Sequence, residues 1–134
     1  MTETSEVNEG GCMCGAVRYR LHGPFTYSAH CHCRSCQRAV GAGYVTYSAV
    51  PPENFEIIKG EMAIYHSSPG VNRGFCSKCG TSLSYSGDDW TDYAIMSATL
   101  DHPSTAVPTS NVFTSEKQRW VALDESLKKF HGFP

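Results

Sequence analysis

The spacing of the cysteines is the feature that most constrains how this chain can fold. The sequence of 134 residues contains seven cysteines, and each lies within three residues of another. They form three clusters: Cys12 and Cys14, then Cys31, Cys33 and Cys36, then Cys76 and Cys79. Such clusters are typical of zinc sites, because neighbouring ligands converge on one tetrahedral centre. The odd number of cysteines argues against a complete disulfide framework.

Seven cysteines are enough for two zinc sites of different kinds. A closed structural site takes four protein ligands, and an open catalytic site takes three. Cys76 and Cys79 form a zinc knuckle, in which the following Gly80 permits a tight backbone turn. A knuckle supplies only two ligands, and Cys12 and Cys14 can supply the other two. The remaining three cysteines, Cys31, Cys33 and Cys36, would then bind a second ion and leave its fourth position open.

Spacing alone leaves a second pairing open. Cys31 and Cys33 could join the knuckle, with the other three cysteines outside that site. Local geometry favours the first pairing. His30 and His32 lie beside and within the triplet and could supply a fourth ligand, but we expect both to be neighbours of the site or exposed.

Short segments of alternating apolar and polar residues predict an all-β domain. In the clearest of them Val17, Tyr19 and Leu21 occupy one face, and the residues between them are Arg18 and Arg20. Further strands are expected within 25–31, 44–48, 55–58, 63–66 and 93–96, with a turn at Gly60 between 55–58 and 63–66. The segments 71–76 and 81–86 lead into and away from the knuckle. A helical turn is expected within 34–43, and a short C-terminal helix at 124–130. We expect residues 1–9 to be a disordered tail and residues 10–134 to form a single domain.

Composition excludes several classes of protein. Hydrophobic residues make up 40% of the chain and charged residues 18%, which is typical of a folded domain rather than a disordered chain. The formal net charge of −2 offers no basic excess, so we expect no nucleic-acid partner. No apolar run is long enough to span a membrane, and the polar start has no secretory signal, so a cytoplasmic location is expected.

Three motifs together resemble the glutathione-dependent formaldehyde-activating enzyme family, which includes centromere protein V. The motifs are the segments 11–19, 31–36 and 74–81, which occur in the family's order, and the resemblance runs from about Gly10 to the C-terminus. It implies a β-tent fold of folded antiparallel sheets. It implies a structural zinc ion held by Cys12, Cys14, Cys76 and Cys79, and a catalytic zinc ion held by Cys31, Cys33 and Cys36.

The resemblance also implies a carbon–sulfur lyase that joins glutathione to formaldehyde, giving S-hydroxymethylglutathione, or cleaves this adduct. A sulfur-rich zinc site suits an incoming thiol, and the thiolate is the nucleophile, so the cysteines act as ligands. The sequence departs from the family pattern after the proline-rich connection, where members often carry a histidine and this chain reads Thr109, Ser110 and Asn111. It departs again at Lys128, where members often have a proline.

Binding of glutathione requires partners for its two carboxylates. Arg34, Arg38, Arg73 and Lys78 lie in or near the clusters and are candidates, although each is first expected to be an ordinary surface cation. Tyr44, Tyr47 and Tyr65 are expected in the core rather than in a pocket. Two alternatives stay open: another thiol or electrophile on the same scaffold, and a zinc-stabilised binding module without catalysis.

Overall fold

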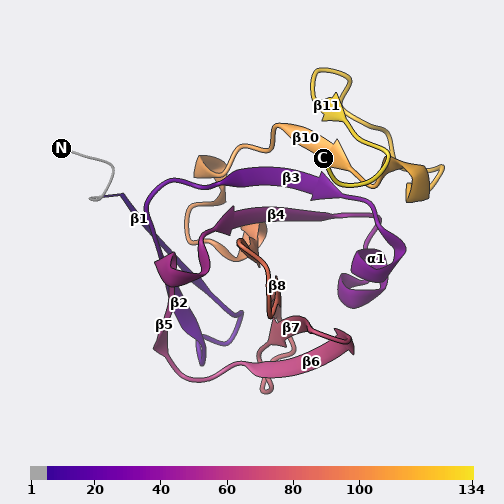
Figure 1. Cartoon of the computed structure of the whole chain (residues 1–134). Coiled ribbons are helices and arrows are strands. Elements are labelled where there is room, and N and C mark those ends of the chain that lie inside the picture. Colours follow the sequence, from indigo (N-terminus) through magenta and orange to yellow (C-terminus); the bar gives the residue numbers. More distant parts are fainter. Residues whose placement is uncertain (1–5) are drawn as a thin grey trace.

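The computed structural model describes residues 6–134, whose strands form two sheets (Figure 1). From edge to edge, the smaller sheet contains β1 (Val7–Gly11), β2 (Arg18–His22) and β5 (Phe55–Lys59). Also from edge to edge, the larger sheet contains β11 (Lys128–Lys129), β10 (Ser110–Val112), β3 (Tyr27–Cys31), β4 (Val45–Val50), β9 (Tyr93–Met96), β8 (Ser82–Gly87), β7 (Val71–Phe75) and β6 (Ala63–Ser68). The predicted all-β class is confirmed.

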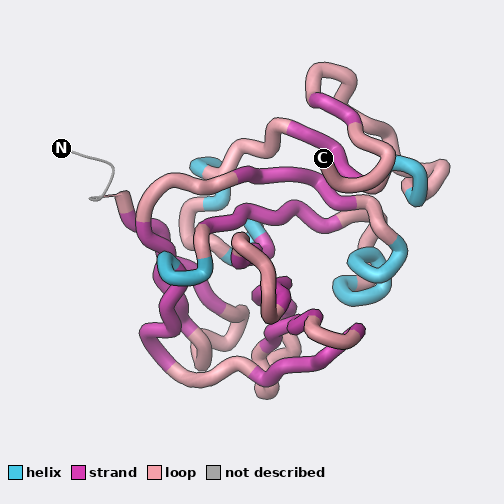
Figure 2. The backbone as a smooth tube through the Cα atoms, in the orientation of Figure 1, coloured by secondary structure: helices cyan, strands magenta, loops and turns pink. Residues whose placement is uncertain are grey.

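Helical segments are short, and most of them lie next to the end of a strand (Figure 2). They are α1 (Arg34–Val40) and the 3-10 turns η2 (Pro52–Asn54), η3 (Ser97–Thr99), η4 (Pro103–Thr105) and η5 (Thr114–Glu116). The expected helical turn within 34–43 is therefore confirmed as α1, which ends at Gly41 in a left-handed conformation. Among residues 6–134, no helix is long and apolar enough to cross a bilayer.

The larger sheet is bent, so its two ends lie on opposite sides of the molecule. In Figure 1, β3 and β4 run side by side across the upper part and β6 lies below. β8 lies between β4 and β6 in this view. Its pairs are antiparallel except where β10 runs parallel to β3 and to β11. The bend brings β7 towards the end of β3, and this approach builds the site described below.

A hydrophobic core joins the smaller sheet to the larger one. The alternation predicted for β2 is present, because Val17, Tyr19 and Leu21 are fully buried whereas Arg18 and Arg20 are half-buried. These three side chains belong to one cluster with Val50, Leu83, Ile95 and Leu100. Burying one large apolar side chain is worth about 1.5–3 kcal/mol, so this cluster fixes how the sheets pack.

The prediction of a C-terminal helix at 124–130 is wrong. That segment forms a turn followed by β11, in which the Lys128 N–H donates to the Thr109 carbonyl at 3.3 Å. The Phe130 N–H likewise donates to the Asn111 carbonyl at 2.9 Å. A seven-residue helix is marginal without tertiary support, whereas pairing with β10 satisfies the backbone of this segment. The Lys128 N–H, which a proline at this position would lack, makes one of these two bonds.

Part of the N-terminal segment that was expected to be a disordered tail forms a strand. Residues 1–5 lie outside the described part of the chain, but Val7–Gly11 forms β1 and pairs antiparallel with β2. The prediction of disorder is therefore wrong for residues 7–9. Backbone pairing explains the difference, together with the contact between Glu9 and the Arg20 guanidinium at 2.7 Å.

The segments on either side of Gly60 are strands, as predicted, but they belong to different sheets. β5 pairs with β2, whereas β6 pairs with β7. Gly60 has φ +74°, and a Cβ atom there would overlap the Ala16 carbonyl oxygen. The chain therefore passes between sheets at a position that only glycine fits without strain.

We expect Gly60→Ala to destabilise the protein more than Gly41→Ala. Both residues have positive φ, +74° and +68°, so each substitution carries a backbone cost of about 1–2 kcal/mol. Only the substitution at Gly60 adds an overlap with backbone, which costs about 1–3 kcal/mol more. Urea unfolding of the two metal-loaded variants measures the difference, and equal losses would contradict the assigned role of Gly60.

Candidate metal centres

Four cysteines meet between the first motif and the knuckle. The sulfurs of Cys12, Cys14, Cys76 and Cys79 all lie within 4.8 Å of one another. The Sγ distances are 3.7 Å from Cys12 to Cys14 and 3.8 Å from Cys14 to Cys76. Tetrahedral zinc with Zn–S bonds of about 2.3 Å places its sulfurs about 3.8 Å apart, so this cluster fits a metal ion. The first of the two pairings is the one that the structure has.

Tight turns at both ends of this cluster aim backbone donors at the sulfurs. In the first turn, the Val17 N–H donates to Cys12 Sγ at 3.3 Å. In the knuckle, the N–H groups of Lys78 and Cys79 lie 3.4 and 3.5 Å from Cys76 Sγ. Hydrogen bonds of this kind favour the thiolate over the thiol, and thiolate is the form that binds a metal.

The knuckle also contains a side-chain donor. The Thr81 hydroxyl lies 3.1 Å from Cys79 Sγ, and this hydrogen bond is the largest cause that lowers the pKa of Cys79 to about 5. Thr81 Oγ1 also accepts from the Met13 N–H at 3.1 Å. One threonine therefore ties the knuckle to the first motif and favours an ionised Cys79.

The other three cysteines form a separate cluster on one short segment. The sulfurs of Cys31, Cys33 and Cys36 lie within 4.8 Å of one another, and Cys31 Sγ is 3.7 Å from Cys36 Sγ. Cys31 ends β3, and Cys33 is the N-cap of α1, where its Sγ accepts from the Cys36 N–H at 3.3 Å. The strand end and the first helical turn thus direct three sulfurs to one point.

Cys36 lies in a site that favours negative charge. The hydrogen bond with Cys31 is the largest of the causes that lower the pKa of Cys36, followed by the one with Cys33. The Tyr47 hydroxyl donates to its Sγ at 3.2 Å, and two guanidinium nitrogens of Arg73 lie 3.9 and 4.0 Å away. Burial and the charge of Cys36 raise the pKa of Tyr47, which keeps this phenol protonated as a donor.

Arg73 is a buried cation, not the surface cation that was first expected. Only 9% of it is exposed, its Nε donates to Ser67 Oγ at 3.1 Å, and its guanidinium lies 4.3 Å from the centre of the Tyr85 ring. These contacts fix its position on β7 beside Cys36. A site with three thiolates and one dication has a net negative charge, and Arg73 offsets it.

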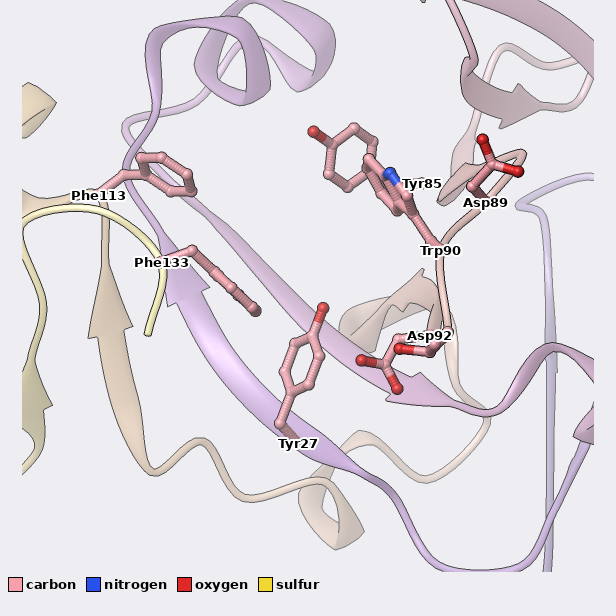
Figure 3. Close-up of a pocket in the computed structure, with 8 residues that line it drawn as sticks. Tyr27, Tyr85, Asp89, Trp90, Asp92, Phe113 and Phe133 are labelled. Atoms are coloured by element: carbon pink, nitrogen blue, oxygen red, sulfur yellow. The ribbon is translucent and has the colours of Figure 1, made fainter.

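One cavity adjoins the triplet, a second shares part of its lining, and a third lies against α1. The first, of about 260 Å³, is lined by Cys31, Cys33, Ser35, Ser67, Ser68, Val71, Arg73, Tyr85, Phe113 and Glu116. The second, of about 460 Å³, shares Tyr85 and Phe113 with the first (Figure 3). The third, of about 390 Å³, is lined by Arg34, Gln37, Arg38, Gly41, Ala42, Gln118 and Trp120. Cys31 and Cys33 thus open to a space that a small molecule can occupy.

Neither candidate histidine belongs to the triplet of sulfurs. His30 Nδ1 lies 2.8 Å from Thr46 Oγ1. The buried His32 contacts Asn111 instead, with Nε2 and Oδ1 2.9 Å apart. Asn111 therefore supports the ring of His32.

The remaining candidates fall in several places. Arg34 and Arg38 are exposed on the third cavity, and Lys78 is exposed on the knuckle. Tyr44 and Tyr65 are 41% and 63% exposed, so their expected place in the core is wrong. Tyr65 lies on β6, the edge strand of the larger sheet, and Tyr44 precedes β4, where its ring contacts those of His30 and His32. Tyr47 is buried as expected, but its hydrogen bond to Cys36 could not be foreseen from the residues alone, because it depends on how β4 lies beside α1. Arg73 could be found from the sequence only as a cation near the knuckle.

Comparisons with known proteins agree with these motifs. The family model described as "Glutathione-dependent formaldehyde-activating enzyme" matches residues 7–116. A Halomonas elongata protein, provisionally named a glutathione-dependent formaldehyde-activating enzyme, is 28% identical over 142 aligned positions that cover 94% of this chain and 88% of that protein.

A crystal structure of a Rhodobacter sphaeroides protein shares the fold. Its TM-score is 0.57 at 18% sequence identity, and the superposition covers 91% of this chain and 98% of the other. The fold likeness and the motif order agree, and the family match extends over most of the chain. This chain therefore belongs to the glutathione-dependent formaldehyde-activating enzyme family.

Proposed function

We propose that this protein is a zinc-dependent carbon–sulfur lyase that reversibly joins a glutathione-type thiol to formaldehyde. Membership of the family supports the reaction. The observation that carries the proposal is the three-cysteine cluster, whose Cys31 and Cys33 line a cavity of about 260 Å³. An ion held by these three protein sulfurs would have a fourth position facing the cavity, where a substrate sulfur could bind.

The two clusters have different roles in this proposal. Cys12, Cys14, Cys76 and Cys79 hold a structural zinc ion, because four protein ligands complete a tetrahedral site. Cys31, Cys33 and Cys36 hold the catalytic ion. When bound there, zinc supplies a soft site at which a thiol ionises.

The protein's own residues hold the charge and move the proton. Arg73 and the Tyr47 hydroxyl offset negative charge at Cys36. Glu116 lines the same cavity, where its Oε1 accepts from the Arg34 N–H at 2.8 Å, and we assign its free carboxylate oxygen to carry the thiol proton. The substrate sulfur attacks the formaldehyde carbon, the carbonyl electron pair moves to oxygen, and that oxygen takes the proton.

The carboxylates of glutathione need cationic partners outside the sulfur cluster. Arg34 directly follows Cys33, and Arg38 lies one helical turn further along α1. Both line the third cavity, and Arg34 is fixed by a hydrogen bond from its guanidinium to Gln37 Oε1 at 2.6 Å. The planar guanidinium groups suit carboxylates, so we assign them to the tail of the thiol.

Exchange NMR of labelled formaldehyde with glutathione tests this function. The protein is first loaded with zinc and checked for two ions per chain. We expect the exchange rate to rise in proportion to the enzyme concentration. A spontaneous rate in protein with two ions would overturn the reaction, leaving another thiol or electrophile, or a binding role, for the same scaffold.

Arg73→Met should weaken zinc binding at the three-cysteine cluster by about 10–100-fold. The variant keeps a long side chain but removes the buried charge that faces Cys36, and residues that support metal ligands typically contribute this much. Competition with a chromophoric chelator measures the affinity. Arg38→Met is the matched control, since Arg38 is exposed on the same helix as Cys36. Equal affinities for the wild type and Arg73→Met would contradict the role of Arg73.

A further inference from the structure

The second cavity has aromatic walls that the reaction of formaldehyde does not use. Figure 3 shows Tyr27, Phe113 and Phe133 on one side and Tyr85 with Trp90 on the other. The rings support each other: Tyr27 and Phe133 have centroids 5.6 Å apart, and Tyr85 and Trp90 have centroids 4.9 Å apart. Such edge-to-face pairs hold the walls in place.

Two of these rings are exposed although they are large and apolar. Trp90 is 40% exposed and Phe133 is 56% exposed. Apolar surface gathered in a concave site is typical of a ligand pocket, because a ligand removes it from water. The volume of about 460 Å³ suits a ring or several carbon atoms, whereas formaldehyde has a single carbon.

Phe113 is held at the boundary between the two cavities in an unfavourable backbone conformation. Its φ is +55°, the left-handed region that bulky side chains rarely adopt. Its N–H donates to the Gly132 carbonyl at 2.9 Å, next to Phe133. The fold therefore accepts local strain, typically about 1–3 kcal/mol, to place this ring beside the sulfur cluster.

The charge of the cavity selects what can enter it. Asp89 and Asp92 line it, and neither has an ion-pair partner among residues 6–134. Burial, with Asp92 as a further cause, raises the pKa of Tyr27 to about 12, so its phenol stays neutral. The two carboxylates would repel an anionic group, whereas they would not repel a neutral or cationic one. This charge disfavours glutathione carboxylates in the cavity.

From these observations we infer that the aromatic cavity binds the organic group of an aldehyde larger than formaldehyde, one with an uncharged or cationic aromatic or branched apolar substituent. The inference rests on the proposed role of the three-cysteine cluster. The thiol sulfur forms a bond to the aldehyde carbon, the carbonyl π bond breaks, and the thiol proton ends on the oxygen. The product is a thiohemiacetal, with no oxidant or reductant required.

Binding of ring probes tests the cavity independently of catalysis. We expect fluorine NMR of the zinc-loaded protein to show that para-fluorobenzylamine and para-fluorobenzyl alcohol bind more tightly than para-fluorobenzoate. Phe133→Ala should weaken binding of the alcohol by about 2- to 10-fold, whereas Trp120→Ala, in the third cavity, should not. Asp92→Asn should reduce the preference for the amine by about 2- to 5-fold, and the exposed Glu53→Gln should leave it unchanged.

Rates with two aldehydes separate this inference from the proposed function. With glutathione as the thiol, we expect the zinc-loaded protein to accelerate adduct exchange of benzaldehyde, and Phe133→Ala to reduce this acceleration more than that of formaldehyde. Acceleration of formaldehyde alone, with no probe binding, would overturn the inference and leave the function standing. Probe binding that responds to Phe133→Ala and Asp92→Asn, with neither aldehyde accelerated, would overturn the function and support the cavity as a ring-binding site.

Discussion

Cys33→Ser is expected to reduce the exchange of formaldehyde with glutathione to the spontaneous rate and to leave one zinc ion per chain. The substitution removes one of three sulfurs that lie within 4.8 Å of one another, so the catalytic ion loses a ligand that serine replaces poorly. Cys33 Sγ is also the N-cap acceptor of α1, 3.3 Å from the Cys36 N–H. Serine is a favoured N-cap residue, so the helix is retained while the ligand is lost.

This design separates the loss of a ligand from the loss of the fold. Metal content by atomic absorption, the exchange rate by NMR and the free energy of unfolding by urea are measured on the same preparation. We expect the metal content and the exchange rate to fall. The part of the free energy of unfolding that does not come from metal binding should change by no more than about 1 kcal/mol, the usual range when one N-cap residue replaces another. Full activity in Cys33→Ser would remove the triplet from the mechanism.

Cys76→Ser is expected to lower the free energy of unfolding by about 2–5 kcal/mol, because the four-cysteine cluster acts as a cross-link between distant segments. Cys76 is 1% exposed and receives N–H groups from Lys78 and Cys79, so serine leaves these donors with a weaker partner. The cluster joins residues more than 60 positions apart, and its loss releases the first motif from the knuckle. Urea unfolding of the zinc-loaded variant measures the change.

The two cysteine variants serve as controls for each other. At a temperature where it remains folded, Cys76→Ser keeps all three sulfurs of the other cluster, so exchange catalysis is expected to persist. A variant with wild-type stability and two zinc ions would contradict the structural role of Cys76. Loss of catalysis in fully folded Cys76→Ser would contradict the separation of the two sites.

The local sequence predicted the strands well, because their alternation reflects which face is buried. Val17, Tyr19 and Leu21 lie in the core as their spacing indicates. The segment 124–130 was predicted wrongly as a helix for a physical reason. Its helical propensity is a local property, whereas its backbone pairs with β10. A pairing between distant segments cannot be predicted from the residues of either segment alone.

The sequence by itself determined that the cysteines act in clusters, because ligands a few residues apart must converge on one centre. It favoured the pairing of Cys12 and Cys14 with the knuckle, and it placed Cys31, Cys33 and Cys36 together. Only the tertiary structure decided what surrounds the triplet. Tyr47 and Arg73 reach Cys36 from β4 and β7, and Phe113 borders the cavity from the end of β10. These contacts depend on the bend of the larger sheet, which no local pattern of residues encodes.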